Sequence, residues 1–565
     1  MDRATRRRLE EYRKAEAGTI ENTLIDELAS GELDRSEFMR RGAMFGLSAS
    51  MLGTVLGALG EAPLALGAPR GQKVGGRLRL AINPPPTKSL DPHLYADVGG
   101  LATGGIAGEF LARSLGQSLV LIPELATSWA PNADASVWRF KLRPRVKFQN
   151  GQTMGADDVV TTFKRLVDPS SGSQALSAYK GVLSPDGVRK INNLTVEFRL
   201  NAPSASFPYL VSSTTFQAII LPADYKLGTF EKTPQATGAF KLVSFTPGVG
   251  ARFDRFNGWW GGKTPLDGVD VTYYADDTAE VAALLSGQID LGNFSFASAR
   301  GLFRNPKVQI FKARSATHRQ VPLRVDLDNP LRDYRVRQAL ALTLDRPTIV
   351  KTLFNNFADI GNDSPFAPLY PSSDLTVPQR HQDLQKAKQL LAAAGHAKGF
   401  AIELTTERVG EIPQLAQLIQ ASARKIGIDV AVNILTSQAY FAGSQTGPPS
   451  GYGSTPWLNA PISITDWGTR IVPNVFLTAA LKTGGVWNAA HYSSRKLNSL
   501  SDSYVAAISL KDQRRYARQI ELTLLHDTPV LFPYFYNVID AAAKNVRGFK
   551  VSLIGQFYLS KTWLA

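Results

Sequence analysis

The chain has 565 residues, with 63 Lys and Arg against 48 Asp and Glu, 44% hydrophobic residues and no cysteine. This length and apolar content exclude a disordered chain and a single small core, so we expect two or three globular units. The lack of cysteine excludes disulfide scaffolds, thiol nucleophiles, iron–sulfur sites and a lipid anchor on a cysteine.

The histidines give no sign of a metal centre. All six are scattered along the chain, and no pair has the spacing of a metalloprotease helix. We therefore predict no metal and no cofactor, with a two-histidine site assembled by folding as the alternative.

Residues 1–68 have the order of an export signal. A charged segment ends in Arg40-Arg41, an uncharged stretch rich in small residues runs from 42 to 60, and a small-residue stretch near residues 65–70 offers a cleavage site. This order is typical of a cleaved leader. The arginine pair is similar to that of a twin-arginine signal, although Ser36 stands where its second arginine is usual. We expect a periplasmic protein, with an uncleaved anchor as the alternative because a bilayer span needs about 20 residues.

The net charge of +15 does not indicate nucleic-acid binding. The first 68 residues hold more acids than bases, so the remainder is more basic than the whole chain. Its charges are dispersed, however, and no basic strip with interleaved aromatic residues occurs. We interpret the charge as a solubilising surface that attracts anionic solutes.

The first half alternates strands and helices. Strands are predicted where polar and apolar residues alternate, and helices where acids begin a segment with apolar residues on one face. The predicted strands are 137–142, 195–200 and 269–274, and the predicted helices are 156–166 and the segment from Asp277 to Gly287.

The second half has clear helix boundaries. Asp333 and Asp345 are N-cap residues of two consecutive helices. Further helices are predicted at about 382–394 and 413–426, each followed by glycine, and the second leads into a strand at 428–432. This helix, glycine and strand unit is typical of an α/β domain. The Gly/Pro/Ser-rich stretch 443–456 predicts a long loop.

The order of several motifs resembles the family 5 extracellular solute-binding proteins of ABC importers, the dipeptide- and oligopeptide-binding group. The resemblance runs from Gly76 to the C-terminus. The matching passages are Leu90-Asp91-Pro92, 123–129, 138–143, 146–151, 158–160, 237–242, 257–262, 284–290 and 335–340.

The resemblance implies a mixed α/β fold of two lobes, with an extra subdomain in the first lobe and a hinge of two crossing strands. We place the crossings near 320–326 and 529–534. The resulting domains are the export signal 1–68, lobe I with its inserted subdomain 69–322, lobe II 323–528, and a C-terminal return to lobe I 529–565.

The same resemblance implies a receptor rather than an enzyme. The protein would capture a peptide, an opine-like compound or a sugar-like solute between its lobes and deliver it to an ABC permease with its ATPases, as a monomer. The alternative is a secreted hydrolase that acts on peptides or glycans with cleft carboxylates.

The family's peptide binders hold the ligand's α-amino group with an aspartate, and Asp466 occupies the matching place. Arg408 is the candidate for a ligand carboxylate, because a guanidinium binds it in a bidentate way. Trp467, Trp487 and the adjacent Asn488 are further candidates for ligand contact. The alternatives are a turn cap for Asp466, a solvated loop charge for Arg408 and core positions for the tryptophans. The chain departs from the family by an arginine in the segment 469–473.

Overall fold

The computed structural model describes residues 13, 19–47, 52, 55, 73–86, 89–95, 97–114, 119–444 and 452–565. The predicted cleavage site and most of the uncharged stretch before it lie outside these residues. So does the middle of the predicted loop 443–456.

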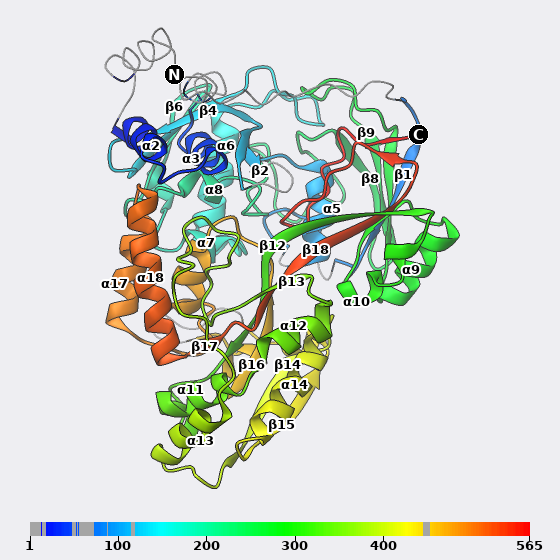
Figure 1. Ribbon diagram of the computed structural model, residues 1–565. Helices are drawn as coiled ribbons and strands as arrows, with labels where there is room; N and C mark the ends of the chain where they lie inside the picture. The colour runs from blue at the N-terminus through cyan, green and yellow to red at the C-terminus, as the bar shows by residue number, and fades with distance from the viewer. Residues whose placement is uncertain are drawn as a thin grey trace.

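In the described part of the chain, one sheet of twelve strands extends through both lobes (Figure 1). Its main path has the order β15-β14-β16-β12-β18-β11-β1-β10-β9-β8, with β13 paired to β18 and β17 paired to β12. The strands are β1 (Arg77–Ile82), β8 (Phe240–Thr246), β9 (Gly250–Arg255), β10 (Gly268–Tyr273), β11 (Leu291–Asn293), β12 (Val308–Pro322), β13 (Ala358–Ile360), β14 (Phe400–Glu407), β15 (Ile428–Leu435), β16 (Ile462–Trp467), β17 (Val530–Leu531) and β18 (Tyr534–Ala543).

The long strands β12 and β18 connect the two lobes. They pair antiparallel from Val308 with Ala543 onward, and the register shifts between Ala313 and Thr317. Beyond this irregularity β12 pairs with β16 and β17 of the lower part of the molecule (Figure 1). The strand β12 begins earlier in the chain than the predicted crossing 320–326, and β18 begins at the last residue of the predicted return 529–534.

A four-stranded antiparallel sheet of order β4-β5-β7-β6 forms the subdomain of the first lobe. The helix α6 begins after Gly155 and buries Val159, Phe163 and Leu166, as the sequence predicts. Elements of this region are α5 (Val98–Ala107), β2 (Ala112–Ser114), β3 (Leu121–Pro123), β4 (Ala126–Pro131), β5 (Val137–Leu142), α6 (Ala156–Val167), η1 (Pro169–Ser171), α7 (Leu176–Tyr179), η2 (Pro185–Gly187), β6 (Val188–Asn192), β7 (Thr195–Arg199), α8 (Phe207–Leu210), α9 (Asp277–Ser286), α10 (Phe296–Ala299) and η3 (Leu302–Arg304).

The lower lobe contains the helix, glycine and strand unit that the sequence predicts, and β14 pairs in parallel with the strand of this unit, β15. Asp333 and Asp345 accept hydrogen bonds from the backbone at the starts of α11 and α12, so both predicted caps are confirmed. Its elements are η4 (Pro330–Arg332), α11 (Tyr334–Leu342), α12 (Arg346–Phe354), α13 (Leu384–Ala393), α14 (Ile412–Arg424), α15 (Ser437–Tyr440) and α16 (Pro456–Asn459).

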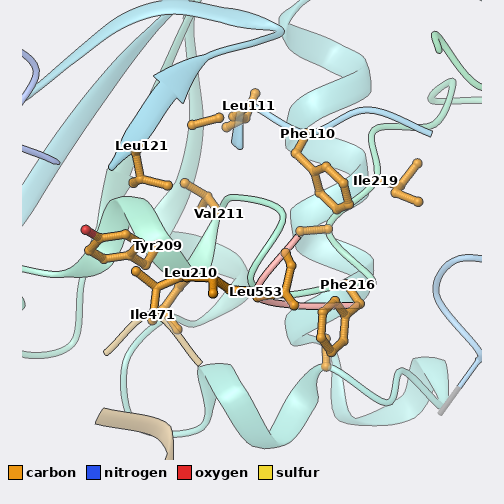
Figure 2. Packing of buried hydrophobic residues seen from close by; sticks show 14 of the residues in the cluster. Phe110, Leu111, Leu121, Tyr209, Leu210, Val211, Phe216, Ile219, Ile471 and Leu553 are labelled. Atoms are coloured by element: carbon orange, nitrogen blue, oxygen red, sulfur yellow. The ribbon is translucent and has the colours of Figure 1, made fainter. Parts of the chain in front are cut away.

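The remaining segments join the lower lobe to the upper one. They are the π-helical η5 (Phe476–Leu481), α17 (Arg495–Ala506), α18 (Leu510–Asp527), β19 (Val546–Arg547) and β20 (Trp563–Leu564). Ile471 packs beside Tyr209 and Leu210 of the first lobe (Figure 2). The segment after β16 therefore shares the larger core, whereas a second core lies between the helices and strands of the lower lobe.

Two helices near the N-terminus, α2 (Thr19–Ala29) and α3 (Arg35–Met44), pack on the body of the protein above α17 and α18 (Figure 1). Leu24, Phe38 and Phe45 are among the buried core residues. Across the described part of the chain, no helix combines the length and the apolar run that crossing a bilayer requires.

Candidate functional site

The predicted ligand residues lie where two parallel strands end. The strands β14 and β16 are paired in parallel, from Leu404 opposite Ile462 to Thr406 opposite Ile464. Arg408 follows the end of β14, and Asp466 and Trp467 are the last two residues of β16. The carboxyl ends of strands are the usual position of ligand sites in open α/β sheets. The fold thus brings Arg408 and Asp466 to one edge of the sheet, beside the hinge strand β12.

A buried arginine of the hinge strand β12 donates hydrogen bonds to several side chains at this edge. Arg319 of β12 has a side chain only 3% exposed. Its Nε and Nη2 donate to the two carboxylate oxygens of Glu411 at 2.8 and 3.0 Å, and its Nη1 donates to the Tyr536 hydroxyl at 2.8 Å and to Asp466. Burial opposes the charge, but Asp466 and Glu411 outweigh it and hold the pKa of Arg319 well above its ordinary value.

The two carboxylate oxygens of Asp466 differ in their hydrogen bonds. Its Oδ1 accepts hydrogen bonds from Arg319 and from the Tyr536 hydroxyl, the latter at 3.1 Å. Among the described residues no donor lies within hydrogen-bond distance of its Oδ2, and the side chain is 30% exposed. A carboxylate oriented in this way can accept a charge-assisted hydrogen bond from a bound cation.

A second carboxyl group lies at the end of β14. Glu407 is buried, and its Oε2 accepts a hydrogen bond from the Ser437 hydroxyl at 2.8 Å. Burial raises the pKa of Glu407 to about 7, with the Asp466 charge adding to the rise against the Ser437 hydrogen bond. This carboxyl group therefore titrates in the neutral range, next to the carboxylate that pairs with Arg319.

The predicted tryptophans form an aromatic cluster. Trp467 lies edge-on to Trp487 with ring centroids 5.4 Å apart, and it also contacts Trp457 and Phe476. Trp467 is buried and its indole Nε1 has no hydrogen-bond partner among the described residues, whereas Trp487 is half-buried. Trp487 therefore has the more accessible ring of the two.

Asn488 is fully buried and closes the loop that carries Trp487. Its Nδ2 donates to the carbonyl oxygens of Lys482 and Tyr492 at 3.2 and 2.8 Å, and its Oδ1 accepts from the Tyr492 backbone at 3.1 Å. The side-chain amide is thus fully engaged within the protein.

Two arginines flank the site in different environments. Arg408 is exposed, and its backbone N–H donates to the Leu435 carbonyl at 2.9 Å. Arg470 lies over the ring of Phe216 of the first lobe, 5.1 Å from its centroid, and has no carboxylate partner among the described residues. Burial lowers the pKa of Arg470 to about 10, against the opposing effects of Tyr370 and Asp466. Arg470 is therefore a charged group that lies against the first lobe, three residues after the end of β16.

A comparison with protein families identifies the family of this chain. The family described as "Bacterial extracellular solute-binding proteins, family 5 Middle" matches residues 120–488. The chain belongs to this family.

Relatives of family 5 cover most of the chain. Heme-binding protein A of Haemophilus influenzae is 25% identical over 465 residues, which are 77% of this chain and 82% of that protein. The dipeptide-binding protein of Escherichia coli is 24% identical over 469 residues, 78% of this chain and 85% of that protein.

Solved structures support the same fold. DppA from Helicobacter pylori in complex with the peptide STSA has a TM-score of 0.75 at 23% identity and covers 87% of this chain and 99% of its own. AgaA from A. tumefaciens in complex with agropinic acid has a TM-score of 0.74 at 22% identity, with 87% and 99% covered. The mixed α/β two-lobe fold and the solute-binding family predicted from the sequence are therefore confirmed.

Sequence reasoning missed the partners of Asp466 in this family 5 protein. Arg319 of β12 and Tyr536 of β18 bind it directly, and Glu411 at the start of α14 binds Arg319. The sequence of β12 could have indicated an ion pair here, because Arg319 is a charged residue among uncharged neighbours from Thr317 to Val321. A charge in a buried hinge strand requires a compensating carboxylate, which points to Asp466 or Glu411.

Proposed function

We propose that this protein is the periplasmic receptor of an ABC importer for a small solute that carries both a positive and a negative group. The observation that carries the proposal is the carboxylate of Asp466, held by Arg319 and Tyr536 through one oxygen while the other oxygen has no partner among the described residues. The solute's cationic group would bind to this free oxygen.

The solute's anionic group would bind to Arg470, with Arg408 as a second contact at the rim. Arg470 is the stronger candidate because burial lowers its pKa and its guanidinium lies over the ring of Phe216 of the first lobe. A charge-assisted hydrogen bond is stronger where water is excluded. Trp467 and Trp487 would cover the apolar part of the solute, and Asn488 would hold their loop in place.

The names of the relatives guide the choice of solutes to test. They include proteins described as binding dipeptides and glutathione, and a solved structure in complex with agropinic acid. Each of these compounds carries charged groups of both signs or a carboxylate. This fits a site in which the Asp466 carboxylate binds a cationic group and the Arg470 guanidinium binds an anionic group. We propose no covalent step for this site, since the carboxylates are explained by the arginine and tyrosines that they bind.

Closure about the hinge would couple binding to transport. Solute held by Asp466 in the lower lobe and by residues near Phe216 in the upper lobe favours the closed form, because it contacts both lobes only there. The closed receptor would deliver the solute as a monomer to a permease and its ATPases after the export signal is removed.

Native mass spectrometry of the protein from its exported fraction tests the proposal directly. We expect a stoichiometric small-molecule adduct, identified after denaturing extraction. Calorimetry then compares a dipeptide, glutathione and agropinic acid on the wild-type protein and on Arg470→Gln. Binding of a zwitterion that is weakened at least about tenfold by Arg470→Gln supports the assignment. Equal binding by both proteins would refute the role of Arg470, and small-angle scattering without compaction on binding would refute closure.

A further inference from the structure

The N-terminal helical hairpin, defined here as residues 19–47, is built into the folded protein. It contains the arginine pair of the export signal that the sequence predicts, and Arg40 is 6% exposed and Arg41 is 0% exposed. Arg40 binds Glu37 through two hydrogen bonds and donates to the Tyr209 hydroxyl at 2.9 Å. A pair that is buried and hydrogen-bonded in this way is inaccessible while the hairpin stays docked.

The hairpin contacts the subdomain of the first lobe at its end. The carbonyl oxygen of Met44 accepts a hydrogen bond from the indole of Trp129 at 2.7 Å. Phe45 stacks on Trp138 with ring centroids 6.1 Å apart. Gly46 lies so close to Trp129 that a Cβ there would stand 1.7 Å from the Trp129 carbonyl oxygen. Only glycine permits this approach, so the docked position is specific.

The same hairpin also contacts the N-terminal end of α18. Arg41 donates to the Gln513 side chain at 2.9 Å and to the Ile508 carbonyl, and Glu27 accepts from the Leu510 backbone at 2.9 Å. Lys511 and Glu32 form an ion pair at the surface.

The other end of α18 is attached to the lower lobe. Arg337 of α11 donates to the Asp527 carbonyl at 2.9 and 2.6 Å, and Gln338 donates to the His526 carbonyl at 2.6 Å. The hairpin and α18 thus form a continuous connection from the first lobe to the lower lobe (Figure 1). Opening of the lobes would have to break or bend this connection.

We propose that the docked hairpin is an intramolecular lock that conceals the arginine pair and holds the lobes of the uncleaved chain closed. Undocking would expose Arg40 and Arg41 and remove, in one event, the contacts that the hairpin makes with both α18 and the first lobe. The consequence for solute exchange rests on the proposed receptor function, whereas the docking and the restraint on the lobes do not.

Trypsin digestion of the full chain tests the docking, with two glycine variants as a matched pair. Gly46→Ala introduces a Cβ against Trp129, whereas Gly31→Ala places one at a similar positive φ with nothing within 4 Å. We expect cleavage after Arg40 and Arg41 to be at least tenfold faster in Gly46→Ala than in the wild type, and unchanged in Gly31→Ala, because a buried helix is cleaved only when it opens. Equal rates in all three chains would overturn the proposal.

Cross-linking tests the same contact without disturbing it, and the cysteine-free chain makes this simple. The double variant Glu32→Cys, Lys511→Cys places two thiols at a surface ion pair, and Glu32→Cys with Lys425→Cys is the control pair. A short bis-maleimide should join the first pair in much higher yield than the second. Similar yields would overturn the docking even if Gly46→Ala does not fold.

Spin labels at Lys147→Cys and Lys425→Cys report the distance between the two lobes in the absence of solute. We expect one distance in the full chain and a second, longer distance when Gly46→Ala is added. An unchanged distribution together with faster cleavage at Arg40 would show docking without a lock and would overturn the restraint. This readout requires no solute, so its failure is distinguishable from failure of the receptor assignment.

Discussion

Arg319 of the hinge strand and Asp466 of the ligand edge are direct partners, both in the strand register of β12 with β16 and as an ion pair. The charge that holds the Asp466 carboxylate in place therefore comes from a strand that connects the two lobes. A change in the twist of β12 would move the guanidinium and, through the ion pair, the carboxylate.

Replacing Asp466 by Asn should weaken solute binding at least tenfold, which is about 1.4 kcal/mol. The amide keeps an acceptor for Arg319 but removes the charge from the oxygen that faces the solute. Calorimetry measures the affinity, and circular dichroism checks that the fold is retained. Asp429→Asn, an exposed position on β15, is the control. An affinity equal to that of the wild type would contradict the role of Asp466.

Replacing Arg319 by Met should destabilise the protein by up to about 3–5 kcal/mol, because Glu411 and Asp466, whose side chains are 11% and 30% exposed, lose their compensating charge. Denaturant unfolding measures the loss. Arg314→Met on the same strand is a matched control, since Arg314 is half exposed in its pair with Asp359 and such pairs contribute about 0–1 kcal/mol. Similar losses in both variants would show that the Arg319 network carries little stability.

The sequence predicted those parts of the fold that depend on local chemistry. The capping carboxylates of Asp333 and Asp345 act within their own turns, so they mark helix starts without knowledge of the tertiary fold. The positive φ of Gly287 likewise ends α9 locally. The position of the first crossing could not be predicted from local sequence. The register shift between Ala313 and Thr317 arises from pairing with β18, more than 200 residues later.

The site was predictable only in part for the same reason. Asp466 was chosen through a family motif, but its partners Arg319 and Tyr536 meet it only after the two crossing strands pair. The export signal raised a different problem. Its charge and composition predicted a removable leader, and neither property reveals that Phe45 stacks on Trp138.

Replacing Asn488 by Ala should lower the free energy of unfolding by about 2 kcal/mol, because the variant leaves buried backbone groups of Lys482 and Tyr492 without partners. Chemical denaturation followed by Trp fluorescence measures this loss. Asn498→Ala, at an exposed amide on α17 that also bonds a neighbouring backbone, is the control and should cost less. We expect affinity to stay within about threefold of wild type. A larger loss of affinity with unchanged stability would assign Asn488 to the solute instead.

Stability should fall as the pH rises through the neutral range, and Glu407 should account for part of the fall. Burial, the largest cause, raises the pKa of this carboxyl group to about 7, above the ordinary value near 4.5. The folded protein therefore holds a proton that the unfolded chain has released, so this contribution is complete below pH 4.5 and is lost by about pH 7. Glu407→Gln removes the titration and should flatten the decline between these values. Glu403→Gln, an exposed position on the same strand, should leave the decline as it is in the wild type. Denaturant unfolding at several pH values measures both variants, and a Glu407→Gln profile parallel to the wild type would show that Glu407 is already ionised in the folded protein.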